Sequence, residues 1–138
     1  MTEVRGLVLT PDGEIEEKLF PPTGHDLLKA LYGAINCDAV QAVLLGHGAH
    51  VGTMYLDEEG KVEQQLAMPN EYATIVVSGV NHVVHEVYTG TAVFLGPPDS
   101  EGNDTSLSEL AATYIRGLVA ALKRTDAVRE FRNGGSDA

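Results

Sequence analysis

Four of the five histidines in this chain fall in two pairs, and these pairs are the best candidates for chemistry. The pairs are His47 with His50 and His82 with His85. Imidazole is the commonest protein ligand for zinc and similar metals, so the two pairs together would supply four ligating nitrogens. A spacing of three residues puts two side chains on one face of a helix but on opposite faces of a strand. Because both pairs are predicted to lie in strands or turns, we expect no bound metal and no other cofactor.

The other nucleophiles and carboxylates lack a suitable setting for catalysis. The acidic neighbour Asp38 would raise the pKa of the Cys37 thiol and so would not activate it. No serine lies in a Gly-x-Ser-x-Gly elbow between a strand and a helix. Glu58 and Glu59 fall in an exposed turn, without the burial that raises the pKa of a catalytic carboxyl group. We therefore predict a protein without enzymatic activity.

The charge is strongly negative and unevenly distributed. The net charge is −11, and residues 1–110 hold 17 acidic side chains against four basic ones. Residues 111–138 hold five basic side chains against three acidic ones. An acidic protein repels phosphate backbones, so direct nucleic-acid binding is disfavoured. A protein partner with a basic surface would be attracted to this charge. Acidity can also serve solubility alone, and that interpretation stays open.

The length of 138 residues and the apolar fraction of 43% are typical of one globular domain. We predict a single α+β domain over residues 1–128 and a disordered tail over 129–138. The lone cysteine cannot form an internal disulfide, and the N-terminus does not resemble a signal peptide. No apolar run approaches the roughly 20 residues that span a bilayer. We therefore expect a cytoplasmic protein without a membrane segment.

A mostly antiparallel sheet with two short helices and a longer C-terminal helix is the predicted fold. Thr10–Gly13 is a turn with proline and Asp-Gly in their favoured places, which indicates a β-hairpin. Thr23 or Asp26 can cap a first helix that ends near Asn36 or Gly33. The predicted strands and first helix of this half are Val4–Leu9, Glu14–Phe20, His25–Ile35, Ala39–Leu45, His50–Leu56 and Lys61–Leu66.

The second half alternates short elements and ends in the clearest helix. Asn70 is a good N-cap for a helix over 71–78, and strands are predicted over Val83–Tyr88 and Ala92–Leu95. Ser106–Glu109 matches a capping box, which predicts a helix over about 106–124 that packs on the sheet or on a second copy of the chain. The expected apolar stripe of this helix consists of Leu107, Leu110, Ala111, Tyr114, Leu118 and Leu122.

Three segments in fixed order also carry a family resemblance. They are the turn Asp57–Gly60, the segment Met68–Thr74 and the segment Gly90–Gly96. Together with Asp26–Leu28 and the strand Ala39–Leu45, their order and spacing resemble the domain-of-unknown-function family three-eight-four-six, which is met in phages, plasmids and conjugative elements. The likeness covers roughly residues 4–96, and the helix after Leu107 is expected to lie outside the common core.

The resemblance implies a fold and a mobile-element context but no activity. Asp57 stands where the family turn usually begins with Asn, and either side chain can bond its own backbone two residues on. We interpret the family-like residues as turn and cap positions that serve the structure. They are Asp57, Glu58, Glu59, Gly60, Asn70, Thr74, Gly90 and Gly96.

The sequence is therefore compatible with three functions. The first is a non-enzymatic accessory protein of a mobile element that binds a host or defence protein, with a homo-oligomer through the C-terminal helix as a further option. The second is a binder of small nucleotide-like ligands, for which Arg5, Lys18, Lys29, Lys61 and Arg116 are the scarce cationic donors. The third and least favoured is a metal-dependent enzyme that uses the histidine pairs.

Overall fold

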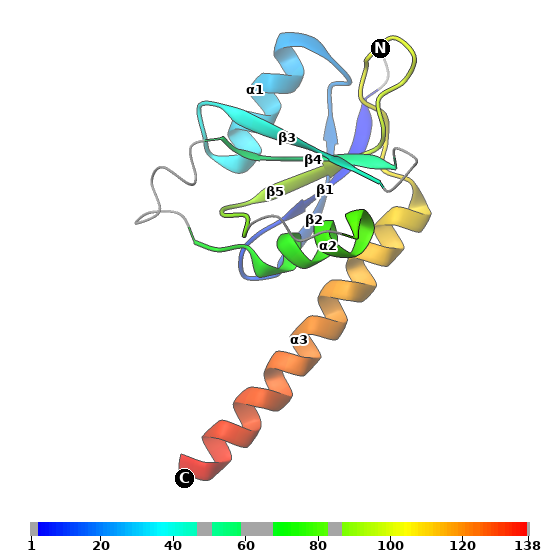
Figure 1. The fold of residues 1–138 in the computed structure, drawn as a ribbon. Coiled ribbons are helices and arrows are strands. Elements are labelled where there is room, and N and C mark those ends of the chain that lie inside the picture. Colours follow the sequence, from blue (N-terminus) through cyan, green and yellow to red (C-terminus); the bar gives the residue numbers. More distant parts are fainter. Residues whose placement is uncertain (1–2, 47–50, 59–67, 83–86, 138) are drawn as a thin grey trace.

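The computed structural model describes residues 3–46, 51–58, 68–82 and 87–137, with the backbone alone described from residue 126 on. Figure 1 shows a sheet with helices on both of its sides, and all strand pairs in the described residues are antiparallel, in the order β2-β1-β5-β4-β3. The predicted α+β class is confirmed. The strands are β1 (Val4–Leu9), β2 (Ile15–Phe20), β3 (Val40–Leu45), β4 (Gly52–Asp57) and β5 (Ala92–Leu95). The helices are α1 (Gly24–Ile35), α2 (Glu71–Asn81) and α3 (Glu109–Asp137).

The β1–β2 hairpin forms around the predicted turn. The Gly13 N–H donates to the carbonyl of Thr10 at 2.9 Å, and Gly13 adopts the left-handed φ of 85° that glycine favours. Strand β2 is an edge of the sheet, and its central residues are exposed and mostly charged. Charged side chains on an edge strand oppose uncontrolled pairing with another chain.

One face of the sheet is covered by α1. The helix ends at Asn36, whose φ of 65° is left-handed, as the stop signal predicted. Thr23 occupies the N-cap position but makes no side-chain capping bond. Leu27, Leu31 and Ile35 pack from the helix against buried residues of the sheet. The sheet residues of this cluster are Val4, Val8, Phe20, Val93 and Leu95.

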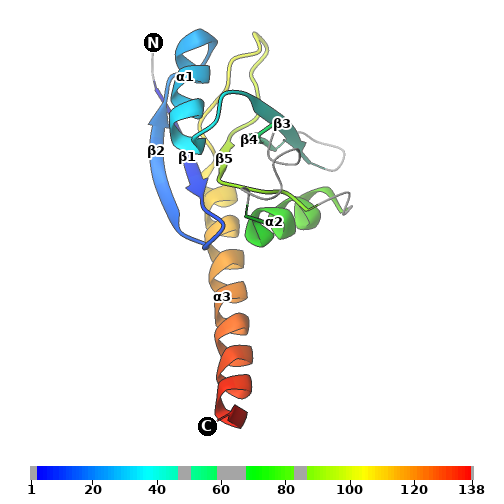
Figure 2. The ribbon, with the colours of Figure 1, turned by 90° about the vertical axis from the view of Figure 1, so that its left-hand side faces the viewer.

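The opposite face is covered by α2 and the first half of α3, which Figure 2 shows on the other side of the sheet from α1. Helix α2 begins at Glu71 with Asn70 as its N-cap, as predicted, but runs three residues past the expected end, to Asn81. Its β-branched residues Val76 and Val77 are buried against the sheet, so packing overrides their strand preference. The sheet therefore lies between two helical layers.

The strand predicted over Val83–Tyr88 is not confirmed in its described part. Val87 and Tyr88, at the end of the strand expected over Val83–Tyr88, are not in a strand, although Thr89 forms a single bridge with Pro69. Residues 83–86 lie outside the described part of the chain, as does the whole of the strand expected over 61–66.

Helix α3 differs from its prediction at both ends. Its N-terminal cap is Ser108, whose hydroxyl accepts from the Ala111 N–H at 3.1 Å, whereas the Ser106 hydroxyl accepts from the Arg5 N–H. The predicted capping box is therefore wrong. The helix continues to Asp137, so the predicted tail over 129–138 is helical up to that residue. Figure 1 shows the second half of α3 extending away from the sheet.

The buried stripe of α3 is also rotated from the predicted one. Ile115 and Val119 are buried in the core, whereas Leu110 is 82% exposed and Tyr114 is 45% exposed. Five residues of α-helix turn the chain by 500°, so Leu110 points about 140° away from Ile115. Leu107, a residue of the predicted stripe, is buried, but it precedes the first residue of the helix. In the described part of the chain, no helix has the length and apolarity that a membrane crossing needs.

Candidate functional site

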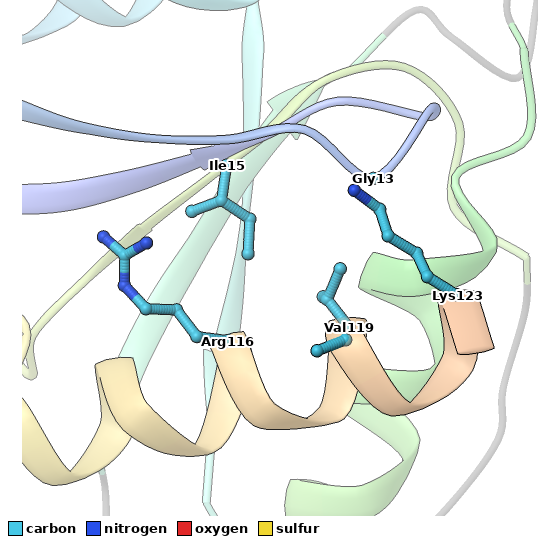
Figure 3. Close-up of a pocket in the computed structure, with 6 residues that line it drawn as sticks. Gly13, Ile15, Arg116, Val119 and Lys123 are labelled. Carbon is cyan, nitrogen blue, oxygen red and sulfur yellow. The ribbon is translucent and has the colours of Figure 1, made fainter.

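A groove lies between the turn of the β1–β2 hairpin and the side of α3 that carries Arg116 and Lys123. Its volume is about 220 Å³, and Figure 3 shows its walls. The lining residues are Gly13 and Ile15 from the hairpin and Arg116, Val119, Ala120 and Lys123 from α3. No acidic side chain belongs to this lining, although the chain as a whole has a net charge of −11.

Two cationic side chains lie at the two ends of this groove. Arg116 and Lys123 are seven residues apart, which is nearly two helical turns, so both lie on the same flank of α3. In Figure 3 the guanidinium of Arg116 lies beside Ile15, while the ammonium of Lys123 reaches Gly13. The two ion pairs recorded in the described residues both involve Arg5, with Glu17 and Glu109. Neither groove cation is therefore paired with a carboxylate in the part of the chain that the structure describes.

The floor between the cations is apolar. Ile15 and Val119 lie between the two charged side chains in Figure 3, and Val119 is buried in the main core. A side chain at Gly13 would collide with Lys123 and with the ring of Tyr72, so glycine allows Lys123 to lie against the hairpin turn. The arrangement suits binding of an anion with an apolar body.

A second polar feature lies on the face covered by α1. The Tyr55 hydroxyl on β4 donates to the carboxylate of Asp104, with distances of 2.9 and 3.1 Å to the two oxygens. Burial and the adjacent carboxylate raise the pKa of Tyr55 well above its ordinary value. Burial also raises the pKa of Asp104, against the opposing effect of the Tyr55 hydrogen bond, and the charge of Asp99 adds to the rise. The pair fastens the loop before α3 to the sheet.

Replacing Tyr55 with Phe is expected to lower the free energy of unfolding by about 1–2 kcal/mol, because the part-buried Asp104 carboxylate loses its donor. Urea denaturation measures this change. The matched control is Tyr114→Phe, which removes the hydroxyl of a more exposed tyrosine and is expected to change stability by less than about 0.5 kcal/mol. Equal effects of the two substitutions would contradict the assigned role of the Tyr55–Asp104 pair.

The raised pKa of Asp104 predicts a pH dependence. The folded state holds this proton more tightly than the unfolded state, where the carboxyl group has its ordinary pKa of 3.8. As the pH falls through the raised pKa towards 3.8, the wild type should therefore gain stability relative to Asp104→Asn. Urea unfolding of both proteins between about pH 3.5 and 7 measures the difference. A difference that is constant, or that favours the variant as the pH falls, would show that burial does not dominate at Asp104.

Three of the family-like residues, Asn70, Thr74 and Gly90, take part in one hydrogen-bond network around the buried Asn70 side chain. The side-chain amide of Asn70 donates to the carbonyls of Leu9 and Gly90, at 3.0 and 2.8 Å, and its oxygen accepts from the Ala73 N–H. The Thr74 hydroxyl donates to the Asn70 carbonyl and accepts from the N–H of Tyr88. Asn70 therefore joins α2, β1 and the segment before β5, which is a structural task beyond the helix capping that its sequence position indicates.

The other family-like residues lie elsewhere. Gly96 follows β5 and packs against the backbone of Ser106, where a side chain would not fit. Asp57 ends β4, and the N–H of the exposed Glu58 donates to the carbonyl of Ala39. Glu59 and Gly60 lie outside the described residues.

Of the four histidines in the two predicted pairs, the structure describes His82. His82 is exposed and ends α2 with a left-handed φ of 60°. His47, His50 and His85 lie outside the described residues, so their separation from His82 is not described. Within the residues that are described, no group of three or more metal-ligating side chains is gathered in one place.

Sequence reasoning found one groove cation and missed the other. Arg116 is among the five donors predicted for a ligand, whereas Lys123 is not. Arg5, Lys18 and Lys29 do not line the groove, and Lys61 lies outside the described residues. The spacing of seven residues between Arg116 and Lys123 was the available signal, because it puts both on one flank of a helix. Nothing in the local sequence indicates that this flank faces Gly13, which lies more than 100 residues earlier.

Comparison with known proteins gives one family. The family model DUF3846, described as a domain of unknown function, matches residues 4–119. The match extends into the first part of α3, so the expectation that this helix lies outside the common core is wrong. Searches of the curated proteins and of the solved structures found no match.

Proposed function

The chain belongs to the DUF3846 family of domains of unknown function, and from this premise we propose a function based on binding. The protein is a non-enzymatic accessory protein of a mobile genetic element, and it acts in the cytoplasm by binding a host or defence protein. The mobile-element context rests on the resemblance of the turn and cap segments to that family. The mode of action rests on the surface of α3.

The supporting observation is an apolar flank of α3 that the rest of the described chain leaves open. Leu110 is 82% exposed and Tyr114 is 45% exposed, and their spacing of four places them on one side of the helix. The Tyr114 hydroxyl lies against Gly79 of α2, while much of the residue stays accessible to solvent. Exposed large apolar side chains on a regular element are a typical feature of protein-binding surfaces, and tyrosine is enriched there.

The charge distribution indicates the chemistry of the partner. Residues 1–110 hold 17 acidic and four basic side chains, so the part of the chain that precedes most of α3 carries a strong net negative charge. A partner that meets Leu110 and Tyr114 with an apolar patch and surrounds it with basic side chains would gain both affinity and association rate. A protein that binds nucleic acid has a basic surface of this kind and would therefore suit as the partner.

Site-specific photo-crosslinking tests the proposal in the full-length protein. A benzophenone side chain is placed at Leu110, at Thr113 or, as a control, at the exposed Leu28 of α1. We expect the two α3 positions to capture the same protein from the host and Leu28 to capture none of it. The purified pair should then bind with a dissociation constant that rises with salt.

Two outcomes would contradict the proposal. Capture of one protein equally from all three positions would show non-specific contact. Crosslinking of the α3 positions only to a second copy of the chain would assign this flank to a homo-oligomer instead.

A further inference from the structure

We propose that the groove between the hairpin turn and α3 is a binding site for a small organic anion, one with acidic groups at both ends of an apolar body. The inference concerns a different surface from Leu110 and Tyr114, so it does not depend on the proposed protein binding. It rests on the order of chemical groups along the groove, which is cation, apolar floor, cation.

The position of the cations determines the charge of the ligand. Arg116 and Lys123 line the groove, and neither has a carboxylate partner among the described residues. In a chain with a net charge of −11, two cations that face one concavity without an acid in its lining create a local positive potential. A carboxylate or phosphate group at each end of a ligand would complete both interactions, with Arg116 able to bind in bidentate fashion.

The apolar residues between the two cations determine the chemistry of the middle part of the ligand. Ile15 and Val119 lie between the charged groups, and Ala120 adds a small side chain that leaves space. Val119 is already buried, but an apolar body over the half-buried Ile15 and the exposed Ala120 removes hydrocarbon surface from water, which favours binding. A polar body would leave its own hydrogen-bonding groups without partners on this floor.

The dimensions determine the size of the ligand. A rise of 1.5 Å per residue separates positions 116 and 123 by about 10 Å along the helix axis. The groove volume of about 220 Å³ lies below the range of roughly 300–1,000 Å³ that drug-sized ligands occupy. A chain of about eight carbons with a carboxylate at each end has the matching length.

Three probes with the same carbon number separate these contributions. Suberate has two carboxylates, octanoate has one and 1,8-octanediol has none. Titrations of the full-length protein, followed by amide chemical shifts in two-dimensional NMR at low salt, give the three dissociation constants. We expect suberate to bind about three- to fivefold more tightly than octanoate, because each exposed ion pair contributes modestly, and octanediol to bind weakest. The shifts should be confined to the hairpin turn and the adjacent flank of α3.

Charge-neutral variants test the two cations. Arg116→Gln and Lys123→Gln should each reduce suberate binding to the level of octanoate, and the double variant to the level of octanediol. Arg124→Gln is the matched control, because Arg124 is exposed on α3 but does not line the groove, and it should change binding less than about twofold.

All of these side chains are on the surface, and thermal unfolding of each variant verifies that it is folded. Equal binding of the three probes would overturn the proposal. An effect of Arg124→Gln as large as that of the groove variants would overturn it as well.

Discussion

Replacing Asn70 with Ala is expected to lower the free energy of unfolding by about 3–5 kcal/mol, the largest effect of any substitution considered. Asn70 is fully buried, and its side chain makes three hydrogen bonds to backbone groups. Removing it leaves the carbonyls of Leu9 and Gly90 and the N–H of Ala73 without those partners. Each unsatisfied buried group costs roughly 1–3 kcal/mol, because no water replaces the lost partner. Urea denaturation followed by circular dichroism measures the change.

The matched control is Ser78→Ala. The Ser78 hydroxyl also makes a hydrogen bond to a backbone carbonyl, that of Thr74, but this bond lies within α2 and the side chain is only half-buried. We expect this substitution to cost less than about 1 kcal/mol. If Asn70→Ala costs no more than Ser78→Ala, Asn70 does not join the three segments in the way that the structure shows.

The second large effect is expected at Gly96. A Cβ atom at this position would overlap the backbone of Ser106 and the hydroxyl of Thr105. Because the obstacle is mainly backbone, Gly96→Ala must displace the segment that leads into α3 and weaken the 2.8 Å bond from the Gly96 N–H to the Thr105 carbonyl. We expect a loss of about 3 kcal/mol, at the upper end of what overpacking usually costs. Thermal unfolding monitored by calorimetry gives the difference directly.

Gly33→Ala is the control, with the opposite expected sign. Gly33 lies inside α1, and nothing is within 4 Å of a Cβ atom built there. Alanine at this site should stabilise the protein by up to about 1 kcal/mol, because it restricts the unfolded chain and favours helix. A Gly96→Ala variant as stable as Gly33→Ala would refute the close approach of β5 to the segment before α3.

The parts of the fold that depend on local sequence could be predicted. The hairpin followed from the turn chemistry of Thr10–Gly13, α1 from its apolar spacing and its stop at Asn36, and the start of α2 from the cap at Asn70. The orientation of α3 could not be predicted in this way. Its apolar residues surround much of the helix, so the sequence allows several buried stripes, and contact with the sheet selects Ile115 and Val119 over Leu110.

The candidate sites depend on contacts between distant parts of the chain. The groove brings Gly13 and Ile15 beside Lys123, and the loop residue Asp104 meets Tyr55 of β4. Such pairs leave no local pattern, because each residue alone resembles an ordinary surface or core position. Sequence reasoning was more useful for Asn70, where the cap preference identified the residue but not its long-range carbonyl partners.

The described residues therefore serve two roles. Among the family-like residues that the structure describes, Asn70 and Gly96 connect the sheet to the helices and to the segment before α3. The exposed flank of α3 and the cationic groove beside it are the surfaces proposed to bind other molecules. The substitutions at Asn70 and Gly96 test the first role through stability, whereas substitutions on the surface of α3 test the second without unfolding the protein.

The most direct test of the binding function is the affinity of the crosslinked partner for a double variant, Leu110→Ser with Tyr114→Ser, measured by calorimetry on purified proteins. The account predicts at least about tenfold weaker binding, because the two residues form the apolar centre of the contact. The control is Leu19→Ser with Leu28→Ser, which removes two exposed leucines from β2 and α1 and should leave the affinity within about twofold. Unchanged binding of the α3 variant, or an equal loss in the control, would contradict the proposal that this protein acts through α3.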